Sequence, residues 1–200
     1  MNAFSTAAAL SVLAATTAAF AAPSSYQYPH SEVGATADAS SCQLKGEAGQ
    51  GSATSAAFAG TAAQDGTVEV ALAGLALRKT HDNHVRQFAE RMVQDYAQSN
   101  DQLEAIVKCE GLVLPTKLDA KHNATIERLD ATSGSAFDRA YLQHIGEKHS
   151  RTVALFESAS RSGDPDLAAF ARRGLSMLHQ HQELADNLRV AMGPRVASTL

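Results

Sequence analysis

Apolar side chains recur at three- and four-residue steps through most of the chain beyond residue 53, which is the spacing of amphipathic α-helices. Four long segments carry this pattern, at about 54–79, 83–110, 135–161 and 165–192, and a short one lies at about 118–131. Residues typical of helix ends separate the segments. Asp82 and Asp164 can cap the helices that follow them, Pro165 suits a first helical position, and Gly111 and Gly193 can end helices.

The connections between these segments indicate how the helices are arranged. Short turns join the first long helix to the second and the third to the fourth, so each pair forms an antiparallel hairpin. The middle connection is long enough to run back across the bundle. The pattern therefore predicts an all-α fold, a ferritin-like four-helix bundle with one long crossover that contains a short extra helix.

The first residues of the chain have a different character. The stretch from Met1 to Ala22 has no charge and contains the small-x-small signature Ala19-Phe20-Ala21, as in a secretory signal peptide cleaved after Ala21. The stretch has no Lys or Arg, and the alternative is a buried or membrane-spanning helix. We therefore predict a signal peptide at 1–21, a flexible segment at 22–53, the bundle at 54–192 and a C-terminal tail at 193–200.

The predicted export sets our expectations for the location of the protein and for the oxidation state of its two cysteines. The protein should be periplasmic or secreted, without a lipoprotein cysteine and without a transmembrane anchor in the mature form. In an oxidising compartment a disulfide could join Cys42, in the flexible segment, to Cys109, near the end of the second helix. Free thiols, or an intermolecular bridge from Cys42, are the alternatives.

Charge and motifs exclude several classes of function. The formal charge is −4, and no basic block or basic–aromatic stripe is present, which argues against nucleic-acid binding. No Cys-x-x-Cys, Gly-rich phosphate loop or Ser-His-Asp arrangement can be argued. The sequence gives no catalytic residue, and a non-enzymatic protein is the favoured interpretation.

One candidate site remains, a polar layer halfway along the bundle. Each of the four long helices carries a polar residue within about three positions of its centre, so with a rise of about 1.5 Å per residue all should lie within about 5 Å of one level. These residues are Glu69, Asp95 beside Tyr96, His149 and His181.

Two interpretations of this layer are open. Glu69, His149 and His181 could bind a divalent transition metal such as iron, manganese or zinc. Alternatively, Glu69 accepts hydrogen bonds from Tyr96 and from one protonated histidine in a structural network. The structural interpretation is favoured, because a dinuclear carboxylate site uses Glu-x-x-His motifs and none occurs in these helices.

Six stretches of the chain carry a further signal; they lie at 66–77, 85–93, 112–118, 137–142, 153–157 and 165–171. In order and spacing they resemble the bacterial family catalogued as "domain of unknown function 4142", whose members are mostly exported and ferritin-like. The resemblance implies the fold, and it implies an acidic residue in the first helix and a central histidine in each of the other three. Glu69, His149 and His181 match this pattern. Tyr96 replaces a usual histidine, Lys148 stands where an acidic residue usually precedes the histidine, and Gln180 stands where Glu is common.

Three hypotheses for the function follow. The first is a non-enzymatic envelope or stress-related protein with a structural polar layer. The second is a metal-binding or metal-dependent redox protein with a degenerate ferritin-like site. The third is an interaction module that uses an exposed face of the bundle, as a homo-oligomer or with an envelope partner.

Overall fold

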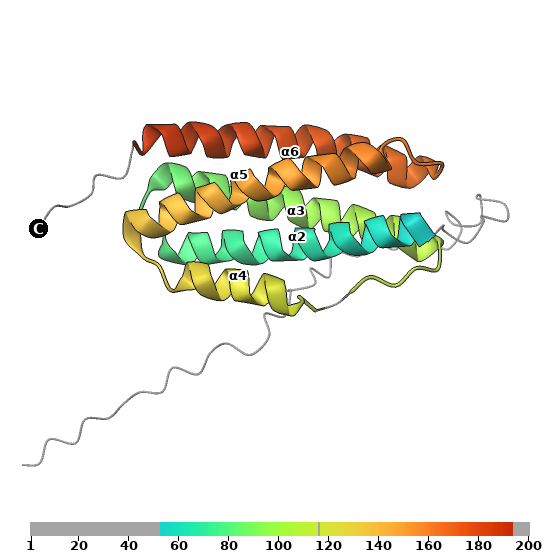
Figure 1. Ribbon diagram of the computed structural model, residues 1–200, viewed down its shortest axis with the longest axis horizontal. Coiled ribbons are helices and arrows are strands. Elements are labelled where there is room, and N and C mark those ends of the chain that lie inside the picture. Colours follow the sequence, from blue (N-terminus) through green and yellow to red (C-terminus); the bar gives the residue numbers. More distant parts are fainter. Residues whose placement is uncertain (1–52, 116, 194–200) are drawn as a thin grey trace, which may run out of the picture. The chain divides into compact units, whose positions relative to one another are not determined.

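A computed structural model describes residues 53–115 and 117–193 of the chain, in which five α-helices follow one another. They are α2 (Ala53–Lys79), α3 (Asn83–Cys109), α4 (Ala120–Asp130), α5 (Gly134–Ala159) and α6 (Pro165–Ala191), as drawn in Figure 1. The predicted signal peptide at 1–21, nearly all of the predicted flexible segment and nearly all of the tail lie outside the described residues.

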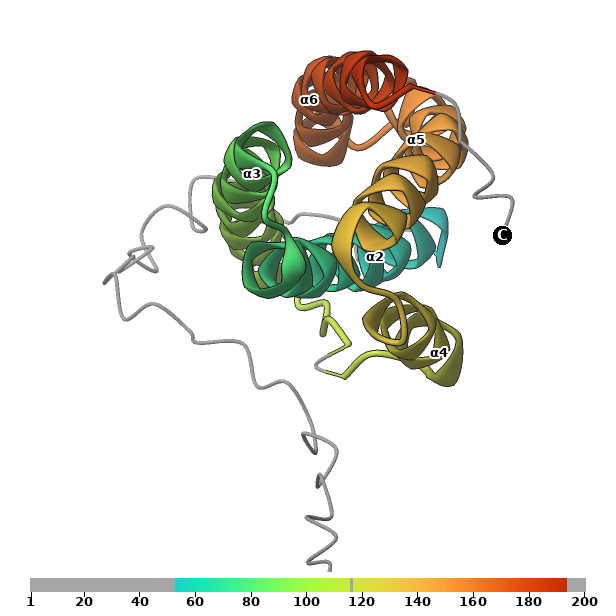
Figure 2. The ribbon, with the colours of Figure 1, turned by 90° about the vertical axis from the view of Figure 1, so that its left-hand side faces the viewer.

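The long helices form two antiparallel hairpins that pack on each other. Helix α2 pairs with α3 and α5 pairs with α6, and across the bundle α3 contacts α6 while α2 contacts α5. Viewed end-on in Figure 2, the four helices surround a common core, and α4 lies outside it against α2 and α5. The predicted all-α bundle is confirmed.

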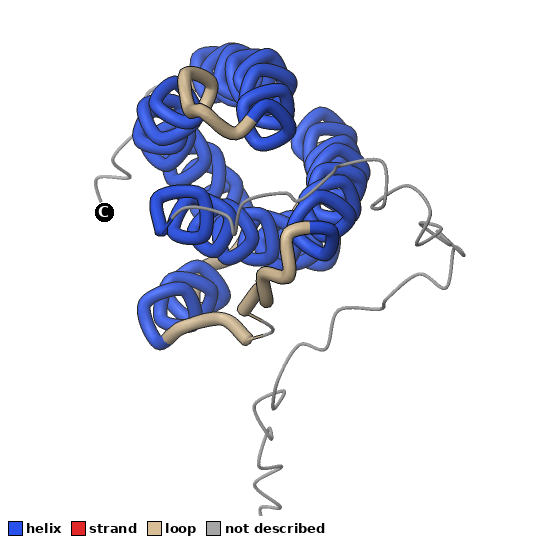
Figure 3. Tube along the Cα trace, turned by 90° about the vertical axis from the view of Figure 1, so that its right-hand side faces the viewer, coloured by secondary structure: helices blue, strands red, loops and turns tan. Residues whose placement is uncertain are grey.

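The connection between the hairpins is the long crossover that the sequence predicts. After α3 the chain turns back along the bundle, and α4 leads it to the end at which α3 began, where α5 starts (Figure 1). Figure 3 shows helices and loops only, and the described part of the chain has no strand. No helix within it is long and apolar enough to cross a membrane.

The helix boundaries follow from local chemistry. The Asp82 carboxylate accepts hydrogen bonds from two backbone amides in the first turn of α3, at 2.8 and 3.1 Å. Asp164 does the same for α6, at 3.0 and 3.1 Å, and Pro165 occupies the first turn. Beyond α3, Gly111 has a φ of +68°, a conformation that favours glycine. Both predicted N-caps are confirmed.

Two aromatic clusters fill the core on either side of its middle. Near one end, three rings from α2, α5 and α6 have centroids 5.2–6.2 Å apart: Phe58, Phe156 and Phe170. Toward the other end lie Phe88, Phe137 and Tyr141, with neighbouring centroids 6.1 and 6.2 Å apart. Most of the apolar residues that recur at three- and four-residue steps in the long helices are buried. Ile106 of α3 and Leu188 of α6 are half-buried, and Val107 takes the buried position in α3.

Glycines permit close helix packing at two places. A Cβ at Gly174 of α6 would lie 2.4 Å from the ring of Phe156 on α5. A Cβ at Gly66 of α2 would lie 2.0 Å from the side-chain oxygen of Asn100 on α3. At Gly174 a larger residue would push α5 and α6 apart, whereas at Gly66 the amide of the half-buried Asn100 can rotate away.

Candidate functional site

The middle of the core, between the two aromatic clusters, contains three polar rings in contact. The rings of Tyr96 (α3), His149 (α5) and His181 (α6) have centroids 5.6–6.1 Å apart, and the first two are stacked nearly parallel. Both histidines are completely buried and Tyr96 is 6 % exposed. We call this group, together with Glu69 and Asp95, the histidine layer.

Each buried histidine forms one strong hydrogen bond through Nε2. His149 Nε2 lies 2.6 Å from the Tyr96 hydroxyl. His181 Nε2 donates to Oδ2 of Asp95 at 2.7 Å, and the same oxygen accepts from Arg91 Nε at 3.1 Å. The half-buried Asp95 therefore links the core histidine to a charged group at the surface between α3 and α6.

Burial keeps both imidazoles neutral. It lowers the pKa of His149 from 6.5 to about 3, and the neighbouring His181 and Lys148 lower it further. Burial also lowers the pKa of His181, although the hydrogen bond and the charge of Asp95 oppose this. The layer is thus a set of neutral rings at physiological pH.

Glu69 of α2 is enclosed in the same part of the core. It is 1 % exposed, and neither carboxyl oxygen has a hydrogen-bond partner among the described residues. Burial raises the pKa of this carboxyl from 4.5 to about 8; Lys148 opposes the rise and Asp65 adds to it. The group is therefore neutral at pH 7, as a buried carboxyl without a hydrogen-bonded partner should be.

The hydrogen bonds of the histidine layer differ from those that we predicted from the sequence. We predicted that Glu69 would accept hydrogen bonds from Tyr96 and from a protonated histidine. Instead Tyr96 pairs with His149, His181 pairs with Asp95, and neither histidine is protonated at neutral pH. The reason is that the tyrosine hydroxyl and a neutral imidazole satisfy each other without placing a charge in the core.

The layer retains unpaired polar atoms that have the chemistry of metal ligands. They are both oxygens of Glu69 and the Nδ1 atoms of His149 and His181, to which the buried hydroxyl of Tyr141 can be added. In the described residues, however, no group of three or more His, Cys, Asp or Glu side chains is arranged so that it could hold a metal ion. The predicted role of Glu69, His149 and His181 as metal ligands therefore remains a prediction.

The other candidate residues lie apart from the layer. Glu147 and Glu183, each two positions from a layer histidine, are exposed, as are His81, His84 and His179. Cys109 is the last residue of α3. Cys42 lies outside the described residues, so the disulfide also stays a prediction.

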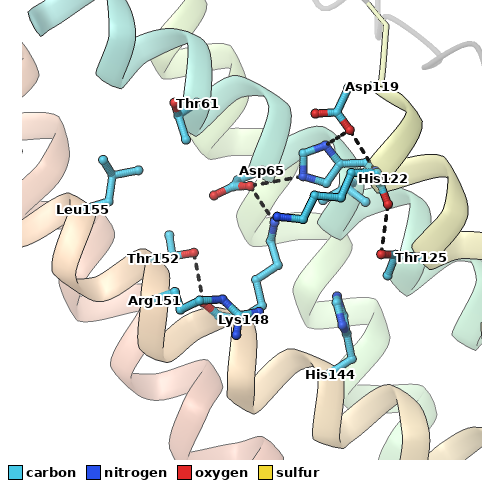
Figure 4. A pocket seen from close by; sticks show the side chains of 12 residues that line it. Thr61, Asp65, Asp119, His122, Thr125, His144, Lys148, Arg151, Thr152 and Leu155 are labelled. Carbon is cyan, nitrogen blue, oxygen red and sulfur yellow. Dashed lines mark hydrogen bonds and ion pairs between the residues drawn. The ribbon is translucent and has the colours of Figure 1, made fainter.

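A second polar site, which the sequence did not indicate, lies between α2, α4 and α5 (Figure 4). It is a cavity of about 350 Å³, and we call it the α4 pocket. Lys148 of α5 is 9 % exposed and donates a hydrogen bond to Oδ1 of Asp65 on α2, at 2.5 Å. His122 of α4 lies 3.5 Å from the same oxygen and 3.0 Å from Oδ1 of Asp119.

The lower wall of the α4 pocket in Figure 4 is formed by α5, which contributes His144 and Arg151 next to Lys148. His144 Nε2 is buried and has no hydrogen-bond partner among the described residues. Burial lowers the pKa of His144 from 6.5 to about 4, and Lys148, Arg128 and Arg151 lower it further, against Glu147. Positive charge thus dominates at this imidazole.

The sequence contained one signal for this pocket that could have been used. Asp65 is four residues before Glu69 and Lys148 directly precedes His149, so both lie within about one helical turn of the predicted layer. The position of α4 could not be read in the same way, because an 11-residue helix with a single buried residue has no clear docking face.

Comparison with known proteins identifies a family and no characterised relative. A family described as domain of unknown function (DUF4142) matches residues 40–188, which is most of the chain. The resemblance seen in the sequence motifs is therefore confirmed. No curated protein and no solved structure matches the chain.

Proposed function

Because the chain belongs to the domain of unknown function 4142 family, we propose that it is an exported, non-enzymatic protein of the bacterial envelope whose histidine layer is structural. The family assigns no activity, so the proposal depends on the chemistry of the layer. The envelope location depends on the N-terminal sequence pattern.

The observation that carries the proposal is the state of the two buried histidines. Each is 0 % exposed, neutral, and bound through Nε2 to another side chain of the protein. A general acid or base must come within hydrogen-bond reach of a substrate, and these imidazoles are enclosed by the core. Buried and hydrogen-bonded polar groups are the expected form of a network that specifies how helices pack.

The alternative is a metal-binding protein, and the unpaired atoms of Glu69, His149 and His181 are the observation in its favour. Elemental analysis of protein purified without added metal separates the two. We expect less than about 0.1 metal ion per chain, and a thermal midpoint that does not change with a chelator, because no metal contributes to stability.

A matched pair of variants makes this measurement decisive. His149→Ala with His181→Ala removes the layer imidazoles, and His84→Ala with His179→Ala removes two exposed ones. One metal ion per wild-type chain that is lost in the first double variant and kept in the second would refute the structural role and establish the metal-binding one.

Export is tested by the mass of the mature chain. When the full sequence is expressed in a Gram-negative host, we expect a periplasmic protein that begins at Ala22. Ala21→Leu should block processing because a small residue is needed before the cleavage site, and Phe20→Leu should not. An intact N-terminus in the wild-type protein, or a cytoplasmic location, would contradict export.

The cysteines provide a second test of the compartment. Peptide mapping without reductant should give a cross-linked peptide that contains Cys42 and Cys109. By loop-entropy arguments such a bond contributes about 4 kcal/mol, so reduction should lower the thermal midpoint. Separately alkylated peptides, from protein isolated with its thiols trapped, would exclude the bond.

A further inference from the structure

The α4 pocket has more positive than negative groups in its wall. Lys121, Lys148 and Arg151 face two carboxylates, Asp65 and Asp119. Lys148 is committed to Asp65, and His122 lies between the two carboxylates. Within the described residues, the Arg151 guanidinium has neither a hydrogen bond nor an ion pair.

A buried imidazole nitrogen lies on the same wall of the pocket as this guanidinium. His144 is one helical turn from Lys148 and two from Arg151, and all three contribute to the same wall in Figure 4. Its Nε2 is buried without a partner among the described residues, which has a cost unless a ligand or water occupies the cavity beside it.

We propose that the α4 pocket binds a small organic or inorganic anion, whose carboxylate or phosphate group is held by Arg151 and by Nε2–H of His144. A guanidinium is suited to this task because its parallel N–H groups match the oxygens of a carboxylate or a phosphate. The Lys148 ammonium adds to the positive electrostatic potential of the pocket while it stays hydrogen-bonded to Asp65. A cavity of about 350 Å³ is at the lower end of the range for ligand pockets, which favours a small metabolite over a polymer.

The same arrangement of side chains argues against a bound cation in the α4 pocket. The Asp65 oxygen that a divalent ion would need is in contact with the Lys148 ammonium at 2.5 Å. No group of three acidic, histidine or cysteine side chains in the described residues could hold a metal. The Asp65 carboxylate is therefore already paired with Lys148, and the unpaired Arg151 guanidinium can only donate hydrogen bonds.

The test uses the wild-type protein and inorganic phosphate, followed by acetate, with chloride added to hold the ionic strength constant. NMR of the imidazole nitrogens follows His144 during the titration. We expect saturable shifts at His144, and a rise of its pKa from about 4 in the presence of the bound anion, because negative charge opposes Lys148, Arg128 and Arg151. Phosphate and acetate then report which head group the pocket prefers.

Two variants should change the affinity in opposite directions, and a third is a control. Arg151→Gln should weaken binding by about tenfold or more, since it removes the only unpaired guanidinium in the wall. Asp65→Asn should strengthen binding several-fold, because it removes a negative charge and frees the Lys148 ammonium. Arg173→Gln, at an exposed position of α6 outside the pocket, should have no effect beyond about twofold.

Other results would overturn the proposal. Equal shifts with chloride alone would mean that salt screening, and not binding, moves the His144 signal. Unchanged affinity in Arg151→Gln, or weaker binding in Asp65→Asn, would show that the anion is not held by these groups. Arg151 is exposed and its replacement should fold normally, so thermal unfolding of each variant separates loss of binding from loss of structure.

Discussion

Glu69 is the residue at which the structure makes its sharpest thermodynamic prediction. Its carboxyl is 1 % exposed, has no hydrogen-bond partner among the described residues, and has a pKa raised from 4.5 to about 8. The folded chain therefore holds a proton on Glu69 at pH values at which the unfolded chain has released it. Stability from this group is complete below pH 4.5 and is lost as the pH rises through about 8.

The size of the effect follows from the two pKa values. At about 1.4 kcal/mol per pH unit, the difference between 4.5 and about 8 corresponds to about 5 kcal/mol of folding free energy. About 3 kcal/mol of this should be lost between about pH 5.5 and about pH 8.5, where unfolding can be measured conveniently.

The buried histidines change stability in the opposite direction and must be separated from Glu69. The pKa of His149 falls to about 3 and that of His144 to about 4, so their contribution is present above pH 6.5 and is lost as the pH falls. The wild-type curve alone therefore understates the effect of Glu69. Subtracting the curve of Glu69→Gln cancels the histidine contributions, since the amide cannot ionise and has nearly the same shape.

The assay is urea unfolding at several pH values, followed by circular dichroism at constant ionic strength. We expect Glu69→Gln to match the wild type within about 1 kcal/mol at about pH 5.5 and to exceed it by about 3 kcal/mol at about pH 8.5. Glu183→Gln, at an exposed position of α6, is the control and should parallel the wild type. A constant difference between Glu69→Gln and wild type across this range would refute the raised pKa.

Two further pairs of substitutions test the core. Tyr96→Phe should destabilise the fold by about 1–3 kcal/mol, because it leaves His149 Nε2 without its partner. Tyr141→Phe removes a hydroxyl that has no partner among the described residues, so it should be neutral or stabilising in urea unfolding. Gly174→Ala should lower the free energy of unfolding by about 1–3 kcal/mol, because the new methyl group overlaps with a phenylalanine ring of α5. At Gly60 no atom lies within 4 Å of the new Cβ, so Gly60→Ala should stabilise the protein by up to about 1 kcal/mol. Equal effects within either pair, measured by thermal and urea unfolding, would contradict the packing that we describe.

The fold could be predicted from the sequence because its signals are local. Asp82, Asp164 and Pro165 mark helix starts through groups that act within one turn, and the apolar spacing between these marks defines the buried faces. The boundaries of α2 and α3 were within one or two residues of those observed. The same local rules say little about α4, which has one fully buried residue, Leu129, and depends on its neighbours for its position.

The sequence predicted where the candidate site lies, but it did not predict which side chains form hydrogen bonds with each other. Counting residues from the helix ends placed Tyr96, His149 and His181 at one height, and the structure brings their rings together. Which polar atoms form hydrogen bonds with each other depends on the rotation of each helix about its axis and on the side-chain rotamers. Neither can be read from the spacing of residues in the sequence. The pairing of His181 with Asp95 was missed for this reason.

The two polar sites of the bundle are electrostatically connected, although they face different directions. On α5, Lys148 and His149 are consecutive and therefore about 100° apart around the helix, so one lies in the α4 pocket and the other in the histidine layer. On α2, Asp65 lies one turn before Glu69, so the pocket and the layer are also neighbours along this helix. Lys148 lowers and Asp65 raises the pKa of Glu69, so a change of charge at either of these two residues alters the protonation of the core. Replacing Lys148 would therefore disturb both sites at once, whereas Arg151 is exposed and is not among the groups that shift the pKa of Glu69. For this reason Arg151 and Glu69, taken separately, test the pocket and the layer independently of each other.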